Sequence, residues 1–186
     1  MATKIYIDQG HNPVNPNAGA EGNGLREQDI VYEIGLRLSR ILRSAGFETR
    51  LSRPTRETQL GTSNASSLAS RVNEANSWGA GYFISLHTNA SAVSSATGSE
   101  AFVYRLGSSA SRLAENILTG IQSYTGLYSR GVFQRPSLYV LRKTSMPAVL
   151  VELGFITNPG DAALMNTQPE LFARGIAEGI FDYLGV

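Results

Sequence analysis

Three short apolar runs, each followed by a side chain that can bind a metal or carry a proton, constrain this chain more than any other feature. The runs and the residues that follow them are 4–8 with His11, 82–86 with His87, and 148–151 with Glu152. The two histidines are the only ones in the chain. In open parallel α/β sheets, ligands bind outside the carboxyl ends of the strands. The three runs therefore predict one active site at one edge of a sheet.

The segments between these runs have the periodicity of helices. From Glu27 onward, apolar residues recur at steps of three and four, which makes one apolar helical face. Similar patterns predict helices at 66–78 and 108–125, a short helix opening at 158–161, and a last one from 169. Strands that alternate with helices need crossover connections, which favour parallel pairing.

We therefore expect an α/β fold with a mainly parallel, twisted sheet of about six strands and helices on both faces. Residues 1–186 should form a single domain, since their number suits one hydrophobic core. The expected strands are 4–8, 47–51, 82–87, 98–104, 138–141 and 147–153. Residues 12–24 and 88–97 are rich in turn-forming or small polar residues and should be loops, and residues 130–136 should be irregular.

Composition excludes several classes of protein. The net charge of +1 gives no basic surface of the kind that nucleic-acid binding needs. No cysteine is present, so disulfides and thiolate zinc sites are excluded. No apolar run approaches the roughly 18 residues of a membrane helix. We expect a monomer with neither nucleic-acid nor membrane partners. The first residues run directly into a strand and show no signal peptide.

The candidate ligands define the type of metal site. With two histidines and no cysteine, two imidazoles and one carboxylate make the only common zinc set available. His11 and His87 would supply the nitrogens, and Glu21 or Glu27 the oxygen. Glu27 begins a helix, which is a more rigid platform than the loop around Glu21, so we favour Glu27. Glu152 would then be free to act as a base.

Each of these residues also has a plainer interpretation. A lone histidine at a strand end is more often structural than a ligand. Glu27 alone would be explained as a helix-start acid that the helix dipole favours, and Arg71 and Asn76 in the second helix are best read as structural. Glu152 is harder to explain in this way, because a carboxylate directly after a buried apolar run is costly unless it is paired or bound to a metal.

Several motifs, taken together, resemble a known family. They are residues 7–11 (Ile-Asp-Gln-Gly-His), 24–27 (Gly-Leu-Arg-Glu), 71 with 75–76, 85–90 (Ser-Leu-His-Thr-Asn-Ala), 98–100 (Gly-Ser-Glu) and 149–158. In this order they resemble the zinc-dependent N-acetylmuramoyl-L-alanine amidases of the amidase type 3 family, which are peptidoglycan hydrolases. The resemblance covers nearly the whole chain. It departs at Gln9, where the family usually has proline, and at Asn12 and Pro13, where two glycines are common.

The resemblance implies one zinc ion per chain, held by His11, Glu27 and His87. It implies Glu152 as the catalytic carboxylate and Asn89 as a substrate contact. The bond cut would join N-acetylmuramic acid to the L-alanine of the stem peptide in the bacterial cell wall. Without a signal peptide, the protein would reach the wall through cell lysis, as phage or sporulation enzymes do, or as a domain of a longer secreted protein.

Two other functions stay open at this point. One is a domain of the same fold that binds the cell wall without cutting it, which the four filled positions disfavour. The other is a different zinc enzyme, such as a peptidase or a carbohydrate deacetylase. The helical His-Glu-x-x-His motif of one large class of zinc peptidases does not occur in the chain.

Overall fold

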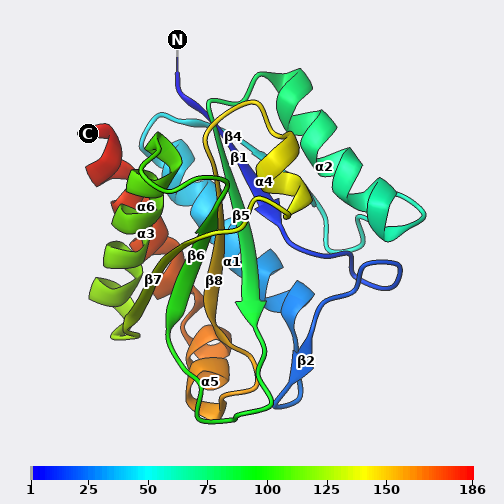
Figure 1. The fold of residues 1–186 in the computed structure, drawn as a ribbon, viewed down its shortest axis with the longest axis vertical. Helices are drawn as coiled ribbons and strands as arrows, with labels where there is room; N and C mark the ends of the chain where they lie inside the picture. Colours follow the sequence, from blue (N-terminus) through cyan, green and yellow to red (C-terminus); the bar gives the residue numbers. More distant parts are fainter. Residues whose placement is uncertain (1) are drawn as a thin grey trace.

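A six-stranded sheet lies between two layers of helices in the computed structural model, which describes residues 2–186. Figure 1 shows the sheet nearly upright. Its strands, in spatial order, are β4 (Glu48–Leu51), β1 (Lys4–Gln9), β5 (Tyr82–Asn89), β8 (Ala148–Phe155), β6 (Ser99–Val103) and β7 (Ser129–Gln134). All neighbouring strands are parallel except β6 and β8. The expected α/β fold and mainly parallel sheet are confirmed.

Helices cover both faces of the sheet, as expected. Helices α1 (Glu27–Ser44), α3 (Ser109–Thr125) and α6 (Pro169–Leu184) pack on one face, and α2 (Asn64–Trp78) and α4 (Tyr139–Lys143) on the other. In Figure 1, α4 lies in front of the sheet and α1 behind it, with α5 (Pro159–Thr167) at the lower end. Within residues 2–186, no helix has both the length and the apolar character required to span a bilayer.

The apolar runs are nearly continuous because the central strands are buried on both faces. Successive side chains of a strand point to opposite faces. Ile5 and Ile7 accordingly pack against the layer of α1, α3 and α6, while Tyr6 packs under α2 and α4. The same alternation places Asp8, His87 and Glu152 on the face that α2 and α4 share.

Two expectations about local structure were wrong. Most of the segment 130–136, expected to be irregular, lies in β7 (Ser129–Gln134), and the strand expected at 138–141 is replaced by helix α4. β7 is an edge strand that pairs only with β6 and is largely exposed, so it carries no apolar alternation. α4 has only five residues, which is too short to display a helical period.

The strands near the site also differ in detail from expectation. β5 and β8 continue past His87 and Glu152, to Asn89 and Phe155, with a register shift after His87. Within the loop after His11, β2 (Glu21–Gly22) pairs with β3 (Leu25–Arg26) as a short hairpin. The hairpin turns the chain back toward the sheet directly before α1 begins at Glu27.

Candidate active site

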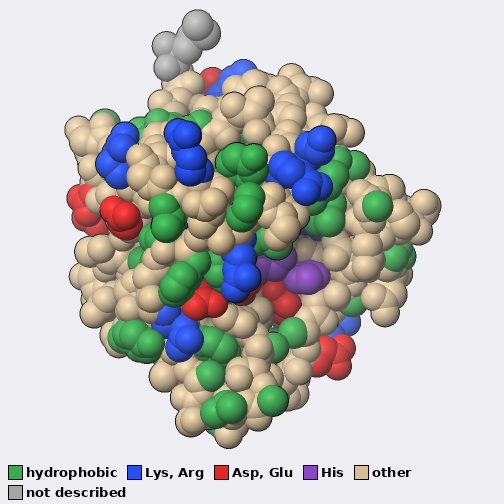
Figure 2. All heavy atoms as spheres, in the orientation of Figure 1, with side chains coloured by type: hydrophobic (Ala, Val, Ile, Leu, Met, Phe, Trp, Pro, Cys, Tyr) green, Lys and Arg blue, Asp and Glu red, His purple; other side chains and the backbone are tan. Residues whose placement is uncertain are grey.

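Three of the four predicted residues converge on one point. The Nε2 atom of His11, the Nδ1 atom of His87 and the Oε1 atom of Glu27 lie 3.1 Å from one another in all three pairs. The residues come from the end of β1, the end of β5 and the first turn of α1. Both histidine side chains are 20% exposed and the Glu27 side chain only 4%. Figure 2 shows the histidines at the surface, next to acidic side chains, near the centre of this face.

A buried ion pair fixes the end of β1. The guanidinium of Arg71, in α2, donates hydrogen bonds to the Asp8 carboxylate and to the backbone oxygens of Gln9 and His11. The hydroxyl of Ser85 donates to the other oxygen of Asp8 at 2.7 Å. Arg71 was expected to be structural, and its contacts agree: it ties α2 to the backbone that carries His11.

Two glycines allow the donor atoms to come so close. A Cβ atom on Gly10 would lie 2.5 Å from Cε1 of His87, and one on Gly19 would lie 2.8 Å from Oε2 of Glu27. Both distances are far shorter than a van der Waals contact, so no larger residue fits without displacing the cluster. His11 itself has a φ of 65°, which is uncommon for a residue with a side chain.

The carboxylate of Glu27 is held in place by two backbone groups. Its Oε1 atom accepts a hydrogen bond from the N–H of Thr88 and its Oε2 atom from the N–H of Ala20, both at 2.9 Å. Burial alone would raise the pKa of Glu27, but the hydrogen bonds and charges of His11 and His87 outweigh it and hold the pKa well below its usual range. Glu21, the other candidate, lies exposed in β2.

The three donor atoms suit a zinc ion. Two imidazole nitrogens and one carboxylate oxygen form a known catalytic zinc set that leaves a fourth position open. Ligand atoms about 2.05 Å from a tetrahedral zinc lie about 3.3 Å apart, close to the 3.1 Å separations of the donor atoms here. His11, Glu27 and His87 are the only such group of potential ligands within residues 2–186.

Glu152 lies beside this cluster without belonging to it. It is opposite His87 in the β5–β8 pairing and opposite Glu100 in the β8–β6 pairing, so the three side chains line one face of the sheet. The Oε2 atom of Glu152 is buried and has no hydrogen-bond partner within the described chain. Burial, followed by the negative charges of Glu27 and Glu100, raises the pKa of Glu152 to about 8.

Glu100 belongs to the 98–100 motif of the resemblance, but no role at the site was predicted for it from the sequence. Its two carboxylate oxygens accept hydrogen bonds from the side-chain amide of Asn89, at 2.7 Å, and from Nε of Arg130, at 3.0 Å. The signal that would have revealed it is the pairing of its strand with the strand of Glu152, which the weak alternation of residues 98–104 does not disclose. Asn89 therefore lies at the site edge with one amide hydrogen engaged by Glu100.

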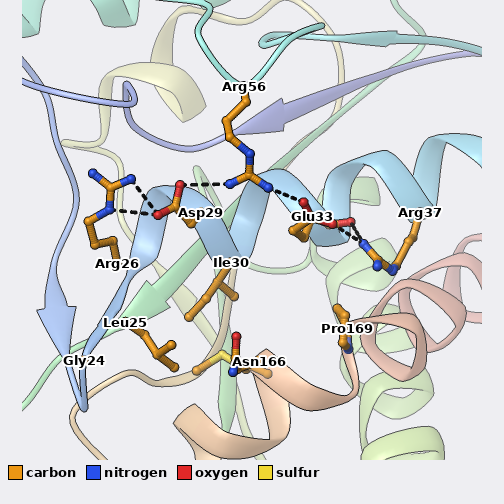
Figure 3. A pocket seen from close by; sticks show the side chains of 11 residues that line it. Gly24, Leu25, Arg26, Asp29, Ile30, Glu33, Arg37, Arg56, Asn166 and Pro169 are labelled. Carbon is orange, nitrogen blue, oxygen red and sulfur yellow. Dashed lines mark hydrogen bonds and ion pairs between the residues drawn. The ribbon is translucent and has the colours of Figure 1, made fainter.

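Larger cavities lie away from this cluster. A cavity of about 490 Å³ runs along α1, beneath the ion-paired side chains of Arg26, Asp29, Arg56 and Glu33. Figure 3 shows these charged groups engaging one another along the helix. A smaller cavity of about 140 Å³ touches both His11 and His87. Donor chemistry rather than cavity volume identifies the candidate site.

Comparison with known proteins points in one direction. The profile of the Amidase_3 family, described as N-acetylmuramoyl-L-alanine amidase, matches residues 5–182. The amidase LytC of Bacillus subtilis is 36% identical over 184 residues, which is 96% of this chain and 35% of LytC. The sporulation-specific amidase of the same organism is 35% identical over 182 residues, 95% of this chain and 66% of that protein. The chain thus spans between a third and two thirds of these relatives.

Solved structures agree with the fold. The catalytic domain of CwlV, an N-acetylmuramoyl-L-alanine amidase from Bacillus (Paenibacillus) polymyxa, superposes with a TM-score of 0.85 at 31% identity and covers 99% of both chains. The CwlD amidase from Clostridioides difficile, solved in complex with the GerS lipoprotein, has a TM-score of 0.90 at 26% identity and 98% coverage of both chains.

Proposed function

We propose that this chain, which belongs to the N-acetylmuramoyl-L-alanine amidase family, hydrolyses the amide between N-acetylmuramic acid and the L-alanine of the stem peptide in peptidoglycan. The observation that carries the proposal is the convergence of His11, Glu27 and His87 beside Glu152, whose buried Oε2 atom has no hydrogen-bond partner within residues 2–186. Hydrolysis assisted by a metal needs both parts: ligands that leave the metal accessible, and a group that accepts a proton.

His11, Glu27 and His87 would hold one zinc ion per chain. When bound, zinc would lower the pKa of the attacking water to about 7 and polarise the amide carbonyl. The surrounding residues keep the Glu27 ligand in the form and orientation that metal binding needs. The low pKa of Glu27 keeps its carboxylate ionised, and the backbone N–H groups of Thr88 and Ala20 fix its orientation.

Glu152 would act as the general base and then as the general acid. It would take a proton from the attacking water and deliver it to the nitrogen of the leaving L-alanine. A catalytic carboxylate works best when its pKa lies near the operating pH, and burial raises the pKa of Glu152 to about 8. Its buried Oε2 atom has no other partner in the described chain, and the positive charge of a bound zinc would favour the ionised carboxylate that accepts the proton.

The surroundings of the cluster supply the rest of the site. We infer that the loops at 12–24 and 88–97 line an open groove, since the substrate extends from the cut bond as glycan on one side and peptide on the other. Asn89 remains a predicted substrate contact at the edge of this groove. One of its amide hydrogens already binds Glu100, so a substrate would use the second.

The non-catalytic alternative fits the site less well. A domain that only binds the wall has no need of a buried carboxylate without a partner, and such a group costs free energy. A different zinc hydrolase would be separated by its products. The amidase releases peptides with a free L-alanine amine and leaves a lactyl carboxylate on the glycan.

We infer that residues 1–186 act as one catalytic domain, as a monomer, on the bacterial cell wall. Family members include both a Bacillus phage SPP1 endolysin and a sporulation-specific amidase. Both routes to the wall, release by lysis and export as part of a longer protein, therefore remain compatible with the proposal.

The variant Glu152→Gln distinguishes a catalytic domain from a domain that only binds the cell wall. Glu152→Gln keeps the shape of the side chain but cannot accept a proton. The expected pattern is retained zinc, retained binding to insoluble peptidoglycan, and cleavage slower by at least about 100-fold, in the range of general acid–base roles. Zinc is measured by elemental analysis and cleavage by the appearance of free L-alanine amines.

The matched control is Glu178→Gln, since Glu178 lies exposed on α6, on the opposite side of the sheet. It should behave as wild type in all three measurements. Loss of zinc in Glu152→Gln would make Glu152 a ligand and return Glu27 to the role of a helix-start acid. Unchanged cleavage would remove the base from the mechanism and with it the proposal.

A further inference from the structure

Part of the sheet face that carries Glu152 is left uncovered by helices. α2 and α4 cover the central strands, but the side of β6 and β7 presents aromatic side chains to solvent. Phe133 in β7 is 43% exposed, and Tyr104, directly after β6, is 50% exposed. Phe102 lies opposite Phe133 in the β6–β7 register, with ring centroids 6.4 Å apart. These rings form a platform beside the candidate site.

Arg135 lies over this platform. Its guanidinium is 5.1 Å from the ring centroid of Phe102, close enough for a cation–π contact. The backbone N–H of Arg135 donates to the oxygen of Val103 at 2.9 Å, which anchors the residue where β7 ends. Its guanidinium has no ion pair or hydrogen bond within residues 2–186. Arg130, the neighbouring cation on β7, is by contrast paired with Glu100.

The platform adjoins the reacting centre. Phe102 is two residues after Glu100, on the same face of β6, and Glu100 lies opposite Glu152. Two residues along a strand span about 6.8 Å. Phe102 is thus one strand and two residues from Glu152, about 8 Å between Cα atoms, and the guanidinium of Arg135 lies 5.1 Å from the centroid of the Phe102 ring. The charge of Glu100 is neutralised by its own arginine. A substrate lying across Glu152 toward β7 would meet an aromatic surface and an uncommitted cation.

We propose that this surface of Phe102, Phe133 and Arg135 binds the stem peptide, and that Arg135 pairs with a free carboxylate of that peptide. The inference rests on the proposed function, because it assigns one arm of that substrate to one side of the site. The lactyl carboxyl group of N-acetylmuramic acid forms the amide bond with L-alanine, so the glycan carries no free carboxylate next to the bond that is cut. Stem peptides carry free carboxylates, and a guanidinium binds a carboxylate through two parallel hydrogen bonds.

Two soluble muramoyl peptides that differ in one group test the assignment. One has a free carboxylate on the residue after L-alanine, and the other has the same group amidated. Arg135→Ala should lower kcat/KM for the free acid by about 10- to 100-fold, the range of a hydrogen bond to a charged group, chiefly through KM. The amidated peptide should change by less than about twofold, and Arg135→Lys should recover part of the loss.

The control is Arg112→Ala, because Arg112 is another exposed arginine, on α3 at the opposite face. It should leave both substrates unchanged. If Arg135→Ala lowers kcat/KM equally for both peptides, as a glycan contact or a disturbed fold would, the proposal is overturned. It is also overturned if kcat/KM for the free acid does not fall. Binding of both peptides to the zinc-loaded Glu152→Gln protein, with and without Arg135→Ala, repeats the comparison without turnover. A wild type that binds the acid through Arg135 yet cleaves neither peptide would contradict the proposed function alone.

Discussion

At the scale of single residues, the pair of Asp8 and Arg71 determines where His11 lies. Both side chains are almost fully buried, and Arg71 donates to the backbone of His11 as well as to Asp8. Removing one member of a buried ion pair leaves an uncompensated charge, which is far more costly than the pair itself is favourable. The position of the first histidine therefore depends on a contact between residues 63 positions apart in sequence.

Asp8→Asn should lower the free energy of unfolding by about 3–5 kcal/mol at pH 7 and weaken zinc binding. Burial alone would raise the pKa of Asp8, but Arg71 and Ser85 hold it below its usual value. A pKa lowered by folding adds stability that is present above the unfolded pKa of about 4 and is lost as the pH falls through the folded one. Urea unfolding between pH 7 and pH 3 should therefore show the free energies of unfolding of wild type and Asp8→Asn converging at acid pH.

The control is Asp182→Asn, at an exposed site, which should change the free energy of unfolding little at any pH. A difference between wild type and Asp8→Asn that stays constant with pH would contradict this account.

Some residues of the site can be predicted from the sequence and others cannot. His11, His87 and Glu152 stand out because each follows an apolar run, and parallel strands bring such ends to one edge. Gly19 gives no such signal, since its need to be small comes from Glu27 approaching it from another element. The position of Glu100 at the site could not be predicted for the same reason. Its place opposite Glu152 depends on the order of strands in the sheet, which no local pattern encodes.

At the scale of elements, two helices cross through glycines. A Cβ atom on Gly120 of α3 would lie 2.0 Å from the backbone oxygen of Gly175 in α6, and one on Gly175 would lie 2.7 Å from the backbone oxygen of Gly120. The helix backbones are thus in direct contact behind the sheet. Long helices such as these were predictable from their periodicity, whereas β7 and α4 were not, because one is an exposed edge and the other is a single short turn.

Gly175→Ala should destabilise the protein by about 1–3 kcal/mol, the usual cost of an overfilled contact. Alanine favours a helix over glycine by about 1 kcal/mol, so the sign of the result shows which effect is larger. Because the obstructing atoms belong to backbone and cannot rotate away, we expect the clash to prevail. Glu178→Ala, exposed on the same helix, should change stability by less than about 0.5 kcal/mol in the same urea titration. A more stable Gly175→Ala protein would show that α3 and α6 can separate freely.

At the scale of the whole molecule, the candidate ligands come from three separate parts of the chain. His11 follows β1, Glu27 opens α1 after the β2–β3 hairpin, and His87 lies in β5. Nothing joins these segments locally, so the donor cluster exists only when the sheet and the helix layer have assembled. An ion that binds all three should therefore stabilise the folded state as a whole, because the unfolded chain offers it no comparable site.

Zinc should accordingly raise the melting temperature, and Glu27→Gln should reduce the effect. At a free zinc concentration of 1,000 times Kd, binding adds about 4 kcal/mol to the free energy of unfolding, which for a domain of this size is a shift of about 8–16 °C. Glu21→Gln, a nearby exposed glutamate in β2, should keep the full shift, and magnesium should give little, because its preferred ligands are oxygens. Calorimetry of the three proteins, each stripped with a chelator and then titrated with zinc, measures the shifts directly. An identical shift in wild type and Glu27→Gln would place the ion elsewhere, and with it the assignment of His11, Glu27 and His87 as one site would fail.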